Sequence, residues 1–304
     1  MDIITDRAYS FSQLGQRDNQ EDARFPDTDT AAAGQRYFVV CDGVGGSDKG
    51  EDASRLVATT IGRQMQKLDL TQEFTDDRLL DVLDHAFIAL DEAADKRHAD
   101  MGTTLTMVVF HAAGCTMAHI GDSRIYHIRP GEGIVYRSDD HSLVNQMVHS
   151  GMLTPDEAVN HPQSNVITRC MEPTRDDQRR SMATVFHTRD IRQGDYVLLC
   201  TDGVLHCISD EELVALVEDD RNCQEKMRTL AERCKDSTDN NTAWMVRVDQ
   251  VLLTEAEQTT AQQVRTVSNN DTLPTGTGMM SMTEIESVRR GKKSLLARIK
   301  NVFS

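Results

Sequence analysis

Short apolar runs alternate along the chain with longer stretches in which apolar residues recur every three or four positions. The short runs are rich in β-branched residues and predict strands. These strands are expected at 37–41, 103–110, 115–120, 124–128, 196–200 and 243–248. The longer stretches, several of which begin at an Asp or Ser cap, predict helices. They lie at 50–67, 76–97, 142–150, 210–218 and 222–236. Turns rather than helices separate the runs between 103 and 128, so much of the strand pairing should be antiparallel.

The pattern changes after residue 254. Residues 255–286 are polar and have no sustained period, which predicts a disordered linker. Residues 287–304 carry six Lys or Arg and no acid, with apolar residues at helical spacing. Such a basic amphipathic segment could lie on an anionic membrane, dock on a partner or on its own domain, or have no function. The sequence therefore predicts one folded domain over 1–254 and an appendage.

The charge of the chain limits its partners. The 304 residues have a formal net charge of −16, which argues against general nucleic-acid binding and suits a protein that gathers cations. The first residues are acidic where a secretory signal is basic and then apolar, and no apolar window is long enough to span a membrane. Seven cysteines without a CxxC pair predict reduced thiols in the cytoplasm and disfavour a zinc site.

Acidic residues gather at the ends of the predicted strands. Asp42, Asp122 and Asp202 each follow an apolar run within a residue or two. Two further polar clusters are Asp239 with Asn240, and Arg17 with Glu21 and Asp22. One Asp-Gly at a strand end is ordinary turn chemistry, but several acids on one rim repel each other and must be neutralised. Carboxylates, a backbone carbonyl and waters are the ligands that hold Mg²⁺ or Mn²⁺.

This set of residue types predicts metal-assisted hydrolysis of a phosphate ester. Two ions about 3.5–4 Å apart that share a carboxylate and a water would lower the pKa of that water and align it for attack on phosphorus. Asp42 is the expected shared carboxylate, and Gly43 lets the backbone approach an ion closely. Arg17 offers a planar fork for phosphate oxygens, with an ordinary exposed ion pair as the alternative.

Five ordered groups of motifs together carry a family resemblance. They are "RDNQED" (17–22), "DGVGG" (42–46), "GTTLT" (102–106) with "GDSRIY" (121–126), "TDGV" (201–204) and "TDNNT" (238–242). Over roughly residues 5–250 the chain resembles the type 2C metal-dependent protein serine/threonine phosphatases, the PPM family, in their compact bacterial form. The resemblance implies an α+β fold, a four-layer αββα sandwich of two antiparallel sheets flanked by helices. It also implies a binuclear metal site at one end of the sandwich.

The same resemblance implies the ligands of two Mn²⁺ or Mg²⁺ ions. Asp42 bridges the two ions. Glu21 and the Gly43 carbonyl serve one ion, and Asp202 and Asp239 serve the other.

Four more residues receive roles from the resemblance. Arg17 grips the phosphate, and Asp22 holds a metal-bound water. Asn240 orients the neighbouring metal ligand. Asp122 matches the position that bacterial relatives use for a weaker third metal.

The chain departs from the family pattern at two positions. Val44 stands where animal members carry a histidine proposed to protonate the leaving group, so that a metal-bound water is left to do so. His206 stands where some relatives place an acid near the third metal. Residues 139–173 resemble the bacterial flap, a helical insertion beside the active site that contacts the substrate protein.

The function implied is hydrolysis of phosphoserine and phosphothreonine on proteins, reversing a companion bacterial kinase. A monomer in the cytoplasm is expected, which 287–304 could bring to the inner membrane face. Two alternatives remain, a catalytically silent phosphatase-like binding module and a regulator that acts on an anti-sigma-factor phosphoprotein. The intact Arg17, Asp42, Asp202 and Asp239 favour the enzyme over the silent module.

Overall fold

A computed structural model describes residues 1–44, 49–97, 101–159, 161–174 and 180–253. The contacts of the chain divide it into the units Met1–Thr254 and Glu255–Ser304. The linker expected at 255–286 and the basic segment at 287–304 lie outside the described residues. None of the described helices is both long and apolar enough to cross a membrane.

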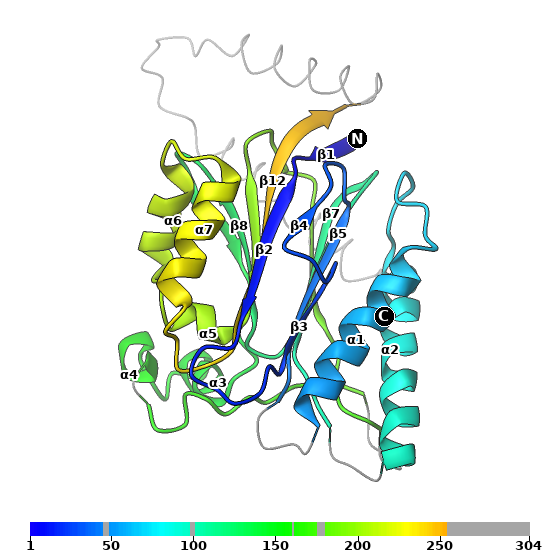
Figure 1. Cartoon of the computed structure of the whole chain (residues 1–304), viewed down its shortest axis with the longest axis vertical. Coiled ribbons are helices and arrows are strands. Elements are labelled where there is room, and N and C mark those ends of the chain that lie inside the picture. Colours follow the sequence, from blue (N-terminus) through cyan, green and yellow to red (C-terminus); the bar gives the residue numbers. More distant parts are fainter. Residues whose placement is uncertain (45–48, 98–100, 160, 175–179, 254–304) are drawn as a thin grey trace, which may run out of the picture. The chain divides into compact units, whose positions relative to one another are not determined.

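The described residues form two antiparallel sheets (Figure 1). The seven-stranded sheet has the order β4 (Thr30–Ala31), β2 (Ala8–Gln13), β12 (Asn241–Leu252), β11 (Tyr196–Cys200), β8 (Arg124–Arg129) and β9 (Gly133–Arg137), with β1 (Asp2–Thr5) also paired to β12. The five-stranded sheet has the order β10 (Thr184–Thr188), β7 (Gly114–Ile120), β6 (Leu105–His111), β5 (Tyr37–Asp42) and β3 (Asp22–Phe25).

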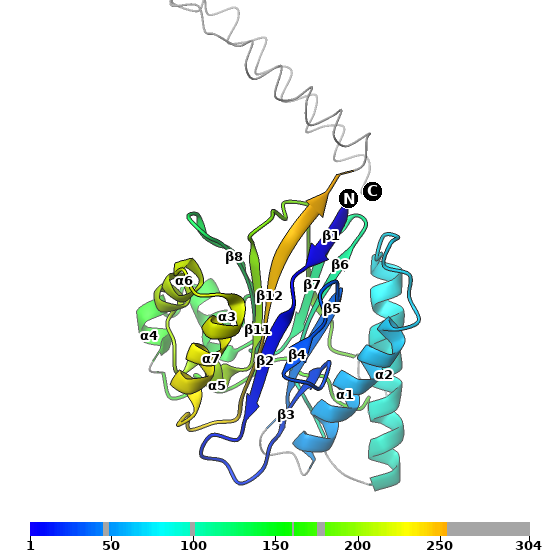
Figure 2. The ribbon, with the colours of Figure 1, turned by 45° about the horizontal axis from the view of Figure 1, so that its top comes forward.

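Helices cover the outer face of each sheet, as Figures 1 and 2 both show. Helices α1 (Gly50–Met65) and α2 (Asp76–Arg97) lie over the five-stranded sheet, and α6 (Asp210–Glu218) and α7 (Cys223–Cys234) lie over the seven-stranded sheet. The short α5 (Asp202–Leu205) follows β11 directly, and α3 (Leu143–His149) and α4 (Pro155–Val159) fall between β9 and β10 in the chain. The predicted αββα sandwich is confirmed.

Apolar side chains fill the space between the sheets. Phe38 of β5 and Trp244 of β12 are both fully buried there, with their ring centroids 5.1 Å apart. The central strands are also buried on their outer faces by the helices, and every residue of β6 and β7 is buried. Burial on both faces explains why these strands appear in the sequence as continuous apolar runs.

Several strands carried too weak a signal to be predicted from the sequence. They are β1, β2, β3, β4, β9 and β10. All are short, between two and six residues, and most mix polar with apolar positions. Their pairing with longer neighbours, rather than their own pattern, makes them strands.

Candidate metal centre

The strand register brings Asp202 and Asp239 to one edge of the seven-stranded sheet. In the antiparallel pair β11–β12, Cys200 lies opposite Ala243. The last residue of β11 and the first residues of β12 therefore share this edge. Asp202 follows β11 by two residues, and Asp239 precedes β12 by two.

Asp122 and Asp42 reach the same end of the sandwich from other strands. Arg124, the first residue of β8, is paired with Cys200 at the end of β11, so Asp122 lies at the edge just described. Asp42 is the last residue of β5 in the facing sheet, and the β3–β5 register places it opposite Asp22.

A cavity of about 360 Å³ lies among these strand ends. Its lining comprises Arg17, Glu21, Asp42, Gly43, Val44, Thr104, Asp122, Asn165, Ile167, Asp202, His206 and Asp239. Seven of the nine residues singled out from the sequence therefore line one cavity. The other two, Asp22 and Asn240, lie buried outside that lining.

Asp22 is held behind the cavity in an unusual state. It is 6% exposed, and its Oδ2 accepts a hydrogen bond of 2.9 Å from the Thr201 hydroxyl, while its buried Oδ1 has no partner. Burial, with the charges of nearby Asp202 and Asp239, raises the pKa of Asp22 to about 8. A buried carboxylate oxygen without a hydrogen-bond partner destabilises the fold, and a donor beside Asp22 Oδ1 would remove that cost in free energy.

The carboxyl groups around the cavity raise one another's pKa. Burial, followed by the charge of Asp22, raises the pKa of Asp42 well above its ordinary value. Burial and the charge of Asp202 raise the pKa of Asp122 to about 7, and burial also raises that of Asp202. A divalent cation would remove this repulsion by favouring the ionised carboxylates.

Gly43 occupies a position that only glycine fits. Its amide donates a 3.0 Å hydrogen bond to the Glu21 carbonyl. A Cβ atom at 43 would lie 2.5 Å from the Gly50 backbone and 2.8 Å from the Glu21 carbonyl oxygen. Because glycine has no side chain, the end of β5 can approach both the Glu21 backbone and Gly50, the first residue of α1.

Arg17 forms an ion pair with Asp239. Its Nη2 lies 2.7 Å from Asp239 Oδ2, and its side chain is 47% exposed. The hydrogen bond to Asp239 raises the pKa of Arg17. In the structure the guanidinium thus neutralises one of the carboxylates that line the cavity.

Asn240 connects the N-terminal loop to the start of β12. Its side-chain amide donates to the Leu14 and Asn19 carbonyls, at 2.8 and 3.0 Å, and its Oδ1 accepts from the Glu21 amide at 2.8 Å. Its own backbone amide donates to Asp239 Oδ1 at 2.8 Å. Asn240 therefore orients Asp239 through its backbone, and its side chain holds the loop that carries Arg17 and Glu21.

The segment 139–173 contributes two lining residues, Asn165 and Ile167, that sequence reasoning missed. Its C-terminal part is fixed beside the cavity by a β-bridge between Thr103 and Met171, with N–O distances of 3.0 and 2.8 Å. Neither residue belongs to a motif with a metal-binding or catalytic pattern, so no signal in the sequence marked them. Thr104, which accepts a hydrogen bond from the Asp42 amide, was quoted only as part of a motif.

The donor set of the cavity fits Mg²⁺ or Mn²⁺. Its acidic residues offer carboxylate oxygens, and burial together with neighbouring aspartates raises the pKa of Asp42 although Arg17 neutralises Asp239. Asp22 Oδ1, buried behind the lining, has no hydrogen-bond partner. Among the described residues, no group of three His, Cys, Asp or Glu side chains is arranged to hold a metal ion by itself. Waters would therefore have to supply part of the coordination of each ion beside the carboxylates.

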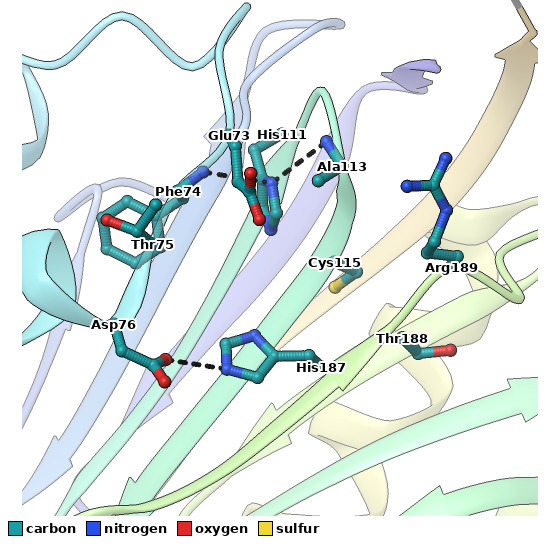
Figure 3. Close-up of a pocket in the computed structure, with 10 residues that line it drawn as sticks. All are labelled: Glu73, Phe74, Thr75, Asp76, His111, Ala113, Cys115, His187, Thr188 and Arg189. Atoms are coloured by element: carbon teal, nitrogen blue, oxygen red, sulfur yellow. Dashed lines mark hydrogen bonds and ion pairs between the residues drawn. The ribbon is translucent and has the colours of Figure 1, made fainter. Parts of the chain in front are cut away.

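A second cavity, of about 370 Å³, lies between the start of α2, the β6–β7 hairpin and β10 (Figure 3). Both of its histidines have hydrogen-bond partners. His187 Nε2 lies 2.8 Å from Asp76 Oδ1, and His187 Nδ1 lies 2.9 Å from Thr116 Oγ1. His111 Nδ1 accepts from the Phe74 and Ala113 amides. These bonds join α2 to the sheet, and the cavity lacks the converging aspartates of the first.

Comparisons with known proteins agree with this geometry. A family model described as Protein phosphatase 2C matches residues 13–248. The protein phosphatase PhpP of Streptococcus pneumoniae is 34% identical over 203 residues, which cover 65% of this chain and 79% of that protein.

Solved structures give the same result. The serine/threonine phosphatase PstP of Mycobacterium tuberculosis has a TM-score of 0.70 at 28% identity, over 82% of this chain and 100% of that one. The catalytic domain of PstP in complex with two manganese ions has a TM-score of 0.65 at 27% identity, over 81% and 100% of the two chains. The resemblance seen in the sequence motifs is confirmed: the chain belongs to the protein phosphatase 2C family of metal-dependent serine/threonine protein phosphatases.

Proposed function

We propose that this chain hydrolyses phosphoserine and phosphothreonine monoesters on proteins with two Mn²⁺ or Mg²⁺ ions bound in the 360 Å³ cavity. The observation that carries the proposal is the convergence of four strand-end aspartates, Asp42, Asp122, Asp202 and Asp239, on that cavity. The manganese ions in the related PstP catalytic domain support the choice of metal.

The two ions would be held by residues from both sheets. Asp42, at the end of β5, is the proposed shared ligand. Glu21 and the Gly43 carbonyl would complete one site, and Asp202 and Asp239 the other. When bound, the ions supply an activated water and Lewis-acid stabilisation of the phosphate oxygens.

Three other polar groups support this centre. Asp122 is the proposed ligand of a weaker third ion. The unpaired Oδ1 of Asp22 would accept a hydrogen bond from solvent held at the centre. Asn240 would keep Asp239 and the Glu21 loop in place through the hydrogen bonds it makes.

Arg17 is the proposed phosphate ligand. Its exposed guanidinium is paired with Asp239. If cations neutralised Asp239, the N–H groups of Arg17 would become available to phosphate oxygens. Val44 lines the cavity and has no proton to give, so we propose that solvent at the centre protonates the leaving alkoxide. Asn165 and Ile167 would contact the substrate protein from the 139–173 segment.

The partners proposed are phosphorylated proteins and the kinase that phosphorylates them. A monomer suffices for the site, because every proposed ligand comes from one chain. We also propose that the basic segment 287–304, which lies outside the described residues, attaches to an anionic membrane surface.

The proposed activity is tested with a small aryl phosphate and a phosphothreonine peptide. Both substrates should release phosphate in the presence of Mn²⁺ or Mg²⁺. EDTA should abolish the release, because without the ions no group in the cavity activates the attacking water or neutralises the phosphate oxygens. Excess Mn²⁺ added after EDTA should restore it. Hydrolysis that continues undiminished in chelator would rule out the metal-dependent mechanism, and metal binding without hydrolysis of either substrate would favour the silent module.

Removing residues 255–304 should leave turnover of the aryl phosphate unchanged, because 255–286 has too little apolar content to pack on the domain.

Full-length protein should sediment with anionic vesicles at low salt and less so at high salt, since each basic residue near such a surface contributes about 1 kcal/mol and is screened by ions. A full-length variant with Arg289, Arg290, Lys292 and Lys293 changed to Gln is the matched control. Equal sedimentation of all forms would exclude membrane attachment.

A further inference from the structure

His141 holds the loop that carries Asp122. No metal-ligand spacing surrounds His141 in the sequence, so the sequence did not predict a role for it in the site. The His141 amide donates to the Gly121 carbonyl at 2.9 Å, and the Gly121 amide donates to His141 Nδ1 at 3.1 Å. Both backbone polar groups of Gly121 are thus paired with one residue. The His141 carbonyl accepts in turn from the Thr168 amide at 2.7 Å, which ties the two ends of the 139–173 segment to the same point.

The hydrogen bonds define the protonation state of the His141 ring. The Gly121 amide can only donate, so Nδ1 accepts and a neutral ring carries its proton on Nε2. Nε2 can then donate to Thr184 Oγ1 at 2.9 Å, and the longer 3.4 Å approach of Arg169 Nη1 to Nε2 is not a hydrogen bond in this tautomer. Burial, together with the charges of His119 and Arg169, lowers the pKa of His141 to about 4, so the ring is neutral at pH 7. The ring is stacked on His119 at a centroid distance of 4.5 Å, which restricts its rotation.

Gly121 leaves its loop little freedom. Its φ is +104°, and a Cβ atom there would lie 2.6 Å from Thr104 Cγ2. On the other side of Asp122, the Ser123 hydroxyl lies 2.8 Å from the Thr104 hydroxyl, which also accepts from the Asp42 amide. The Asp122 loop is therefore held by Thr104 on one side and by His141 on the other.

We propose that His141 is a positioning residue, whose Nδ1 atom holds the Gly121 amide and thereby directs the Asp122 carboxylate toward a divalent cation. The inference rests on the proposed function, in which Asp122 is the ligand of a weaker third ion. Partners of metal ligands of this kind affect metal affinity without touching the metal. The alternative is that His141 only packs the base of the 139–173 segment.

Two substitutions separate the ring nitrogens. In His141→Asn the side-chain oxygen takes the place of Nδ1 and can still accept from the Gly121 amide. In His141→Gln the polar group is displaced toward the Nε2 position, and Gly121 loses its acceptor. Thr184→Val is the matched control, because it removes the hydroxyl that lies 2.9 Å from Nε2 and leaves the Gly121 bond intact.

The primary readout is Mn²⁺ binding, measured from the electron paramagnetic resonance signal of free Mn²⁺. His141→Gln should weaken the weakest class of Mn²⁺ sites by about tenfold, the lower end of the effect expected for a residue that orients a ligand. His141→Asn and Thr184→Val should stay within about twofold of wild type. Hydrogen exchange at the Gly121 amide should be faster in His141→Gln alone.

The outcomes separate this inference from the proposed function. Equal Mn²⁺ affinity and equal Gly121 exchange in His141→Gln and wild type would overturn the role of His141 while leaving the phosphatase intact. An unchanged weak site in Asp122→Asn would instead remove Asp122 from the proposed ligands. Should His141→Gln fail to fold, the ¹⁵N shifts of the wild-type ring decide, because a proton on Nδ1 rather than Nε2 would exclude the proposed bond.

Discussion

Replacing Asp42 with asparagine should lower kcat on a phosphothreonine peptide by about three orders of magnitude or more. Asp42 is the proposed shared ligand, and an amide cannot supply the second anionic oxygen that bridges two cations. Folding should survive the change, because the Asp42 amide and carbonyl keep their hydrogen bonds with Thr104 and Thr103. The apoprotein should even gain thermal stability, since the variant removes a buried carboxyl group surrounded by other acids.

The measurement compares kcat at saturating Mn²⁺ with the melting temperature in EDTA. Asp81→Asn, an exposed acid on α2, is the control and should change neither quantity. Turnover of Asp42→Asn near that of wild type would show that the ligand assignment is wrong. A lower melting temperature together with lost activity would mean that Asp42 acts on the fold instead.

The metal-free protein should become less stable as the pH rises from 6.5 to 8, by roughly 2–4 kcal/mol or about 5–10 °C in melting temperature. A carboxyl group whose pKa is raised in the folded state stabilises the fold most at low pH and loses that effect as the pH rises through the raised value. Asp22, at about 8, loses the last part of its contribution in this window, and Asp42 changes in the same direction. Asp122, at about 7, completes its loss there.

The window starts at pH 6.5 because buried histidines act in the opposite sense below it. Burial lowers the pKa of His111 and His141 to about 4, so each destabilises the fold as the pH falls below the ordinary histidine value. Above pH 6.5 this opposing effect fades, because an unfolded histidine is half protonated at that pH and almost fully neutral by about pH 7.5.

Denaturant unfolding in EDTA across this range measures the effect. Asp22→Asn should reduce the fall of the unfolding free energy with rising pH, and Asp81→Asn should leave that fall unchanged. With added Mn²⁺ the unfolding free energy should instead rise with pH. Metal binding requires ionised carboxylates, so it strengthens as they lose their protons. A metal-free protein whose stability rose from pH 6.5 to 8 would contradict the raised pKa values.

The sequence by itself determined the central layers of the fold and the acids of the site. Strands β6, β7 and β11 are buried along their whole length, and β5, β8 and the first half of β12 along most of theirs. Their sequences are therefore mostly apolar runs, which could be recognised without any knowledge of their neighbours. An acid directly after such a run must lie at the edge of a sheet. For this reason Asp42, Asp122 and Asp202 could be placed at strand ends, and Asp239 just before a strand, before their distances from one another were known.

Only the tertiary structure decided which strand ends meet and what supports them. Short strands such as β3 and β10 gain their conformation from a neighbour, and their own residues carry too few apolar positions to show a period. Asn165 and Ile167 reach the cavity because a β-bridge fixes Met171 beside Thr103, a contact between residues 68 positions apart. The unpaired oxygen of Asp22 likewise results from burial beneath several elements, which no local pattern encodes.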